Sequence, residues 1–130
     1  MNLIINLNDI NLNYIFFYEP VKNTILESSY FIRIIYSNED IILNGIYLYI
    51  NFEEKLENNL KIIEDLENNI LSKFKSDKNF TKKVKENYIY LHNKNLLSEN
   101  FTSKGMVLKI SGIWETHTNI GLTFKFININ

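Results

Sequence analysis

The sequence predicts one domain of mainly β structure with one long helix. Towards both ends of the chain, apolar and aromatic residues alternate with polar ones at the two-residue period of a half-buried strand. In the middle, apolar residues recur every three or four positions, the period of an amphipathic helix. The 130 residues are enough for one core without staples. We therefore expect residues 1–130 to form a single α+β domain.

The first segment alternates apolar and polar residues from Leu3 to Tyr18, ahead of Pro20, the only proline of the chain. This pattern predicts one bent strand or two short ones. Proline has no backbone N–H to donate, so Pro20 should end the pairing.

Two β-branched and aromatic runs follow, separated by Ser37-Asn38-Glu39-Asp40, and predict a β-hairpin. A three-residue turn puts the large apolar residues of both runs on the core face: Tyr30, Ile32, Ile34, Tyr36, Ile42, Ile46, Leu48 and Ile50. Arg33 then stands on the opposite face beside Tyr47 and Tyr49. A turn of two or four residues would move Arg33 into the core, and burying an unpaired guanidinium is costly. We therefore expect the three-residue turn.

From Phe52 the apolar period becomes helical, and it is carried by Leu56, Leu60, Ile63, Leu66, Ile70 and Phe74. This predicts an amphipathic helix of about five or six turns. Acidic residues gather in its first turns, and Lys73 and Lys75 lie in its last, as the helix dipole favours. The lysines from Lys73 to Lys85 make a local basic segment although the net charge is −1.

Residues 87–93 are ambiguous between a short strand and the end of a second helix, whereas residues 106–114 and 120–130 predict a closing hairpin. The order is thus strand, two-stranded hairpin, helix, two-stranded hairpin. This is the connectivity of the OB-fold, a five-stranded antiparallel barrel with a helix between strands 3 and 4, whose strand face binds oligonucleotides or oligosaccharides. An α+β sandwich shares the same order.

Composition excludes several classes of protein. Hydrophobic residues make up 45% and charged residues 22%, as in ordinary globular proteins, and no apolar run approaches the roughly 18 residues of a membrane helix. The first residues lack the charge pattern and cleavage site of a secretory signal. Without cysteine there are no disulfides and no thiolate chemistry. We expect an intracellular protein that does not bind membranes.

Enzyme motifs are missing from the sequence. The four glycines form neither a dinucleotide fingerprint nor a P-loop. His92 and His117 are isolated, so we expect no metal and no cofactor. The acidic pairs Glu39-Asp40 and Glu64-Asp65 are better explained by a turn and a solvated helix face than by acid/base catalysis. We therefore expect a protein that is not an enzyme.

The aromatic and basic residues predict binding of single-stranded nucleic acid. Five phenylalanines lie among apolar neighbours and are expected to pack in the core: Phe16, Phe52, Phe74, Phe124 and Phe126. Exposed aromatic rings stack on bases, at roughly 1–3 kcal/mol per base, while basic side chains, including the lysines from 73 to 85, follow the phosphates. The predicted binding residues are Arg33, Tyr47, Tyr49, Lys82, Lys83, Lys109, Trp114 and Lys125.

Trp114 has two alternative positions. Strict alternation from Met106 puts Trp114 on the core side with Leu108 and Ile110, and this is the expected arrangement. Gly112 allows another arrangement, because a glycine inside a strand often marks a bulge that shifts the alternation. A bulge would turn Trp114 outward to the side of Lys109.

The stretches FIRIIYSNEDIILNGIYLYI (residues 31–50) and LKISGIWETHTNIGLTFKFI (residues 108–127) resemble a family of small proteins of nucleocytoplasmic large DNA viruses, similar to phage-type single-stranded-DNA-binding proteins with an OB-fold. The helix around residues 62–74 is more weakly similar. The resemblance implies coating of single-stranded DNA during viral replication or recombination, in the host cytoplasm or at a viral replication site, and it brings no catalytic residues. Proteins of this class end in an acidic tail that recruits polymerase and helicase, whereas this sequence ends KFININ.

Two functions therefore compete. The first is sequence-tolerant binding of single-stranded DNA or RNA, with replication proteins or further copies of the chain as additional partners. The second is a non-enzymatic structural or interaction subunit of a virion or a replication complex, which would present a sheet edge or a helix face to a protein. The net charge of only −1 favours the second.

Overall fold

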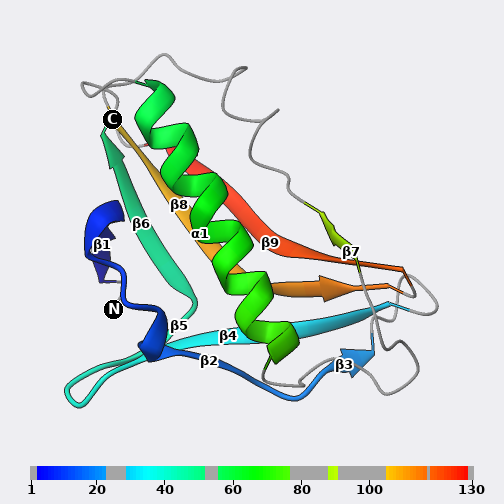
Figure 1. Cartoon of the computed structure of the whole chain (residues 1–130). Coiled ribbons are helices and arrows are strands. Elements are labelled where there is room, and N and C mark those ends of the chain that lie inside the picture. Colours follow the sequence, from blue (N-terminus) through cyan, green and yellow to red (C-terminus); the bar gives the residue numbers. More distant parts are fainter. Residues whose placement is uncertain are drawn as a thin grey trace.

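A computed structural model describes residues 3–22, 29–51, 56–76, 88–90, 105–116 and 118–128. In this part of the chain, nine strands form an open mixed sheet, and one long helix lies across one of its faces (Figure 1). The mainly β class with one helix is thus confirmed. The elements are β1 (Ile4–Asn6), η1 (Leu7–Asp9), η2 (Leu12–Tyr14), β2 (Ile15–Phe17), β3 (Val21–Lys22), β4 (Tyr30–Ser37), β5 (Ile42–Asn44), β6 (Ile46–Asn51), α1 (Leu56–Ser76), β7 (Tyr88–Tyr90), β8 (Gly105–Glu115) and β9 (Asn119–Asn128).

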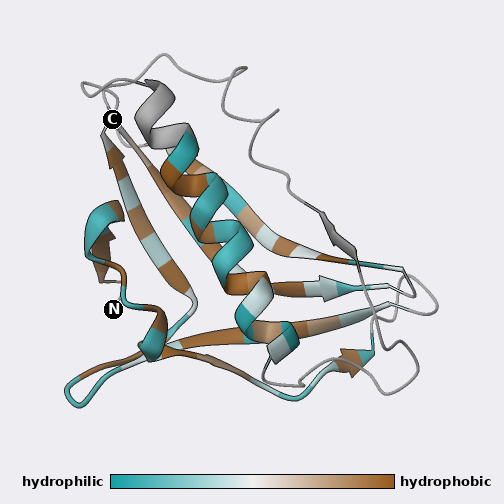
Figure 2. Ribbon diagram, in the orientation of Figure 1, coloured by the Kyte–Doolittle hydropathy of each residue, from teal (hydrophilic) through white to brown (hydrophobic). Residues whose placement is uncertain are grey.

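The helix α1 lies where the apolar period predicts it. Its inward side chains are buried, and all but one adjacent pair are spaced three or four residues from each other: Ile63, Leu66, Ile70, Leu71 and Phe74. Figure 2 shows this stripe as brown segments alternating with teal ones along the ribbon. The stripe packs on a core supplied mainly by β4, β6 and β8, in which Ile34, Leu48 and Ile110 are fully buried. Burying each such side chain contributes roughly 1.5–3 kcal/mol.

β8 organises the sheet because it pairs along its whole length. On one side it pairs with β9, as the closing hairpin predicts. On its other side, residues 105–110 pair with β6 and residues 112–115 pair with β4. β4 and β6 are therefore not the two arms of one hairpin, and that expectation is wrong. The hairpin partner of β4 is the short strand β5.

The loop between β4 and β5 also differs from the expected three-residue turn. Ser37 pairs with Ile42, so the loop comprises residues 38–41. The Asn38 side-chain oxygen accepts backbone hydrogen bonds from Asp40 at 2.8 Å and Ile41 at 2.9 Å, which holds the longer loop closed. As a result Ile42 points outward and is 78% exposed, although the three-residue turn would place it in the core.

Gly45 restores the alternation that the longer loop shifts. Its φ of 94° lies in the left-handed region that favours glycine, and its N–H donates to the Ile34 carbonyl at 3.0 Å. After this irregularity Ile46 is buried, and the following core positions of β6 match the prediction. Arg33 is exposed, as expected, although the register that motivated the expectation is not the one observed.

The N-terminal segment forms the two short strands β1 and β2 with the 3-10 turns η1 and η2 between them. β1 pairs in parallel with β6, and β2 pairs with β4, so the two strands lie at different places in the sheet. Ile15 is buried and Phe16 is 52% exposed, because neighbouring strand residues point to opposite sides. The core assignment of Phe16 is therefore wrong, whereas that of Phe52 lies outside the described residues.

The five-stranded antiparallel barrel is not confirmed. Among the described residues the sheet has nine strands, and it includes the parallel pairs β1–β6 and β7–β9. Residues 87–93 were ambiguous between a strand and a helix end, and within them Tyr88–Tyr90 form the strand β7. It occupies the edge of β9, through which a barrel would have to close, and the sheet stays open (Figure 1).

Candidate nucleic-acid interface

The closing hairpin contains a β-bulge that decides where Trp114 points. Ile110 pairs with Phe124 and Gly112 pairs with Thr123, so β8 has one extra residue, Ser111, at this point. Before the bulge Ile110 is buried, and after it the buried residue is Ile113 rather than Trp114. The expectation of a Trp114 in the core is therefore wrong, and the bulge considered as its alternative is confirmed.

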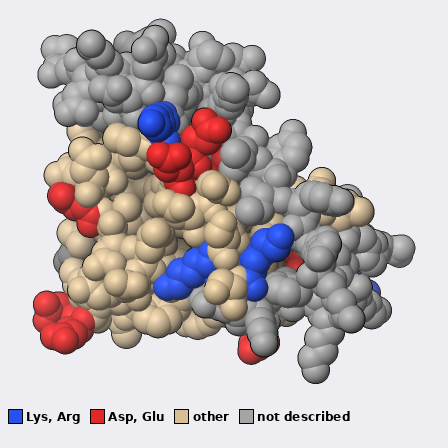
Figure 3. Space-filling view, viewed as in Figure 1, with Lys and Arg blue, Asp and Glu red and all other residues tan. Residues whose placement is uncertain are grey.

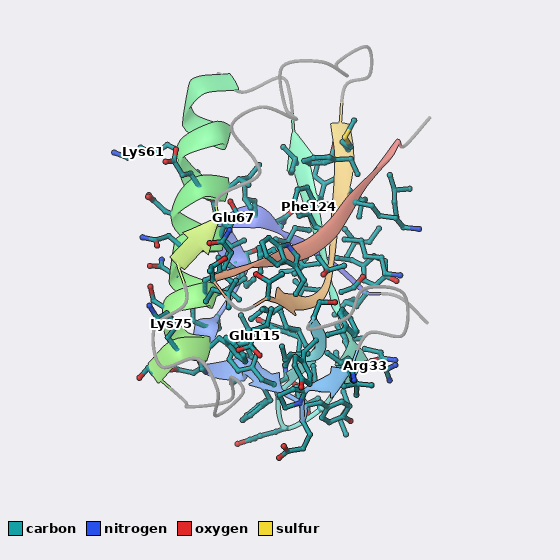
Figure 4. The ribbon with its side chains drawn as sticks, turned by 90° about the vertical axis from the view of Figure 1, so that its right-hand side faces the viewer. Arg33, Lys61, Glu67, Lys75, Glu115 and Phe124 are labelled. Atoms are coloured by element: carbon teal, nitrogen blue, oxygen red, sulfur yellow. The ribbon has the colours of Figure 1, made fainter. Side chains whose placement is uncertain are left out.

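Trp114 joins a set of side chains on the side of the sheet away from α1. We call this set the outer face, and its members are Phe31, Arg33, Tyr47, Tyr49, Lys109, Trp114, Thr123 and Lys125. Figure 4 shows Arg33 pointing away from α1, whereas Glu67 and Glu115 lie between the helix and the sheet. The outer face thus brings together six of the eight predicted binding residues.

Two glycines make room for the aromatic rings of the outer face. Gly121 pairs with Trp114, and a Cβ at Gly121 would lie 2.6 Å from Cε2 and 2.7 Å from Nε1 of the indole. Likewise, a Cβ at Gly112 would lie 2.7 Å from Cε1 of Phe31. Because neither glycine has a side chain, both rings lie close against the sheet. Phe31 and Trp114 both line one hollow of the outer face.

A row of cations crosses the outer face beside the aromatic residues. Lys109 pairs with Tyr47 on one side and with Lys125 on the other. The Lys109 Nζ lies 5.5 Å from the centroid of the Tyr47 ring, a cation–π contact. Like charges directly opposite each other destabilise a sheet by a few tenths of a kcal/mol or more. An anion bound between Lys109 and Lys125 would relieve that repulsion.

The charge of the outer face differs from that of the helix side. At the outward positions of β4, β6, β8 and β9 that the structure describes, the charged residues are Arg33, Lys109 and Lys125, all positive. The side that carries α1 shows acidic and basic side chains interspersed (Figure 3). Among the described residues, the outer face therefore attracts an anionic ligand more than the helix side does.

The lysines of the predicted basic segment do not join this face where the structure describes them. Lys73 donates a hydrogen bond from Nζ to the Leu12 carbonyl at 2.7 Å and lies 5.8 Å from the centroid of the Phe16 ring. It thus ties α1 to the N-terminal segment, and its role as a phosphate contact stays a prediction. Lys82 and Lys83 lie outside the described residues.

Tyr18 is a neighbour of the outer face that pattern reading missed. Its backbone N–H donates to the Arg33 carbonyl at 2.9 Å, and its side chain is 53% exposed. The available signal was the alternation of Tyr14, Phe16 and Tyr18. That pattern is compatible with either face, and only the pairing of β2 with β4 decides between them.

The described residues contain no group of three or more His, Asp or Glu side chains placed to hold a metal ion. In the part of the chain that the structure describes, no helix is long and apolar enough to cross a membrane. Comparison of the chain with known protein families, with curated proteins and with solved structures finds no match in any of the three.

Proposed function

We propose that the protein binds single-stranded nucleic acid through the outer face, without catalysis and without preference for sequence. The observation that carries this proposal is the bulge at Ser111–Gly112, which puts Trp114 on the same face as Arg33 and Lys109. Aromatic rings stack on bases of any identity, and cations neutralise phosphates, so the combination suits a strand whose bases are unpaired.

The site favours a single strand over a duplex. In a duplex the bases are stacked on each other, and no ring of the outer face could reach a base without unstacking it. DNA is the expected ligand, in replication or recombination, by the resemblance to the viral and phage-type family. The proposal also includes a relation of this sheet and helix to the OB-fold.

A binding assay with matched variants tests the proposal. Fluorescence anisotropy of a labelled oligo-dT should rise on addition of the protein, and a labelled duplex of equal length should bind at least tenfold more weakly. Tyr47→Ala should weaken oligo-dT binding about fivefold or more through lost stacking, with little change in the salt dependence. Equal affinity for duplex and single strand would contradict the proposal.

A second candidate function is docking of a protein at the β2 edge. Phe16 on this strand is 52% exposed and Tyr18, directly after it, is 53% exposed, while Ile42 of β5, the other partner of this part of β4, is 78% exposed. Size-exclusion chromatography with and without single-stranded DNA separates the candidates. Self-association that is indifferent to DNA, together with undetectable oligo-dT binding at low salt, would favour this second function.

A further inference from the structure

Two neighbouring hollows open on the outer face and differ in chemistry. The larger has a volume of about 690 Å³, and aromatic residues dominate its wall: Tyr18, Tyr30, Phe31 and Trp114. The smaller has a volume of about 200 Å³ and is lined by Phe31, Arg33, Asn44, Lys109 and Ser111. Phe31 and Arg33 line both hollows, so the two are adjacent.

The larger hollow suits a planar, mostly apolar group. Its volume lies within the roughly 300–1,000 Å³ of small-molecule sites. Trp114 and Tyr18 offer ring faces, and the charged residues of the wall are Glu19, Lys22 and Arg33. The Glu19 carboxylate can accept hydrogen bonds from N–H groups. A nucleobase has both a planar ring system that the aromatic side chains can stack on and N–H groups that the Glu19 carboxylate can accept from.

The smaller hollow suits the opposite kind of group. Its volume is less than a third of that of the larger hollow, and all of its lining residues except Phe31 are polar or charged. Two cations, Arg33 and Lys109, line it together with the amide of Asn44 and the hydroxyl of Ser111, and its lining contains no carboxylate. A guanidinium fork, an ammonium and neutral donors are the groups that bind phosphate oxygens.

We propose that the two hollows form one nucleotide site, with the base in the larger hollow and its phosphate in the smaller one. The inference deepens the proposed function, because it states where one nucleotide of the bound strand would sit. Arg33 lines both hollows and would therefore lie beside both the base and its phosphate. The shared chemistry is that of a nucleotide, either within a strand or free.

Trp114 is the only tryptophan of the chain and reports on this site directly. The probes are thymidine 5′-monophosphate, thymidine and inorganic phosphate, each titrated against the protein while Trp114 emission is followed. The monophosphate should quench saturably at a concentration at least tenfold lower than thymidine does, and phosphate alone should not quench. Equal quenching by thymidine and its monophosphate in the unaltered protein would overturn the nucleotide site.

Two variants with matched controls locate the base and the phosphate. Tyr18→Ala should weaken binding of the monophosphate about fivefold or more, whereas Tyr14→Ala, at an exposed tyrosine that does not line either hollow, should not. Arg33→Gln should abolish the advantage of the monophosphate over thymidine, whereas Lys61→Gln on α1 should preserve it. Circular dichroism checks that all four variants fold. Wild-type binding of the monophosphate by both Tyr18→Ala and Arg33→Gln would overturn the inference.

Competition with oligo-dT identifies the source of the nucleotide. Displacement of the monophosphate by oligo-dT places the site on the path of a strand, and simultaneous binding of both assigns it to a free nucleotide; either result supports the site. Oligo-dT binding without any saturable binding of the monophosphate would overturn the inference alone. Monophosphate binding without any oligo-dT binding would overturn the proposed function alone.

Discussion

The contact between Gly121 and the indole of Trp114 makes a quantitative prediction for Gly121→Ala. A Cβ at this position would clash with Cζ2 of the indole and would lie 2.6 Å from Cε2, so the ring must retreat by about 1 Å to regain an ordinary contact of 3.4 Å. Overpacking of this kind costs about 1–3 kcal/mol. Alanine leaves the unfolded chain with fewer backbone conformations than glycine does, which offsets about 0.4–1 kcal/mol of that cost. We expect Gly121→Ala to lower the free energy of unfolding by about 1–2 kcal/mol.

A double-mutant cycle tests whether the indole is the cause. Urea denaturation followed by circular dichroism gives the free energy of unfolding for Gly121→Ala, Trp114→Ala and the double variant. Without the ring the new methyl group meets no obstacle, so the double variant should be more stable than the sum of the single effects predicts, by about 1–2 kcal/mol. Additive effects would refute the close approach of Trp114 to Gly121, and with it the outward position of the ring.

Three further predictions test the register, the loop and the charges. Ile34→Ala should lower the free energy of unfolding by about 2–5 kcal/mol in urea denaturation, and Ile42→Ala should lower it by less than about 0.5 kcal/mol. Equal losses would contradict the outward position of Ile42 and support the three-residue turn. Asn38→Ala should cost about 1 kcal/mol in the same assay, since two backbone N–H groups lose their acceptor. Lys109→Gln should reduce the slope of log affinity for oligo-dT against log salt concentration by about 0.7, while Lys61→Gln leaves it unchanged.

The elements that could be predicted from the sequence are those whose pattern is local. The helix α1 repeats one apolar stripe over its whole length, and the hairpin β8–β9 pairs neighbours in the chain. Tertiary packing then agrees with the period of each segment. The exposure of Arg33 was predictable for a similar reason, because burying an unpaired guanidinium is costly in any register.

The pairing of distant strands was not predictable in this way. The pattern of residues 30–51 fits one long hairpin. In the structure, only β5, before Gly45, pairs with β4, whereas β6, after Gly45, pairs with β8. Likewise β1 and β7 join the sheet in parallel, which no local signal specifies. Such pairings depend on contacts between segments far apart in the sequence, and those contacts decide whether a barrel closes or a sheet stays open.

The candidate site depended on a single local irregularity. Gly112 signals the bulge, but whether a glycine in a strand shifts the alternation depends on its neighbours, here the Ile32 carbonyl oxygen and the ring of Phe31, which both crowd the missing Cβ position. Once the bulge is present, Trp114 and Arg33 share one face with Lys109 and Lys125. The sequence contained all these residues, and only the register between β4 and β8 brings them together.

The central claim is that an aromatic and cationic outer face receives a single strand, and the salt dependence of Trp114 quenching by oligo-dT tests it most directly. If Arg33, Lys109 and Lys125 each contact one phosphate, the slope of log affinity against log salt concentration should be about −2. Affinity should then fall roughly twentyfold between about 50 and 200 mM salt, with strong quenching throughout. A titration in which oligo-dT leaves the emission of Trp114 unchanged at low salt would contradict the account.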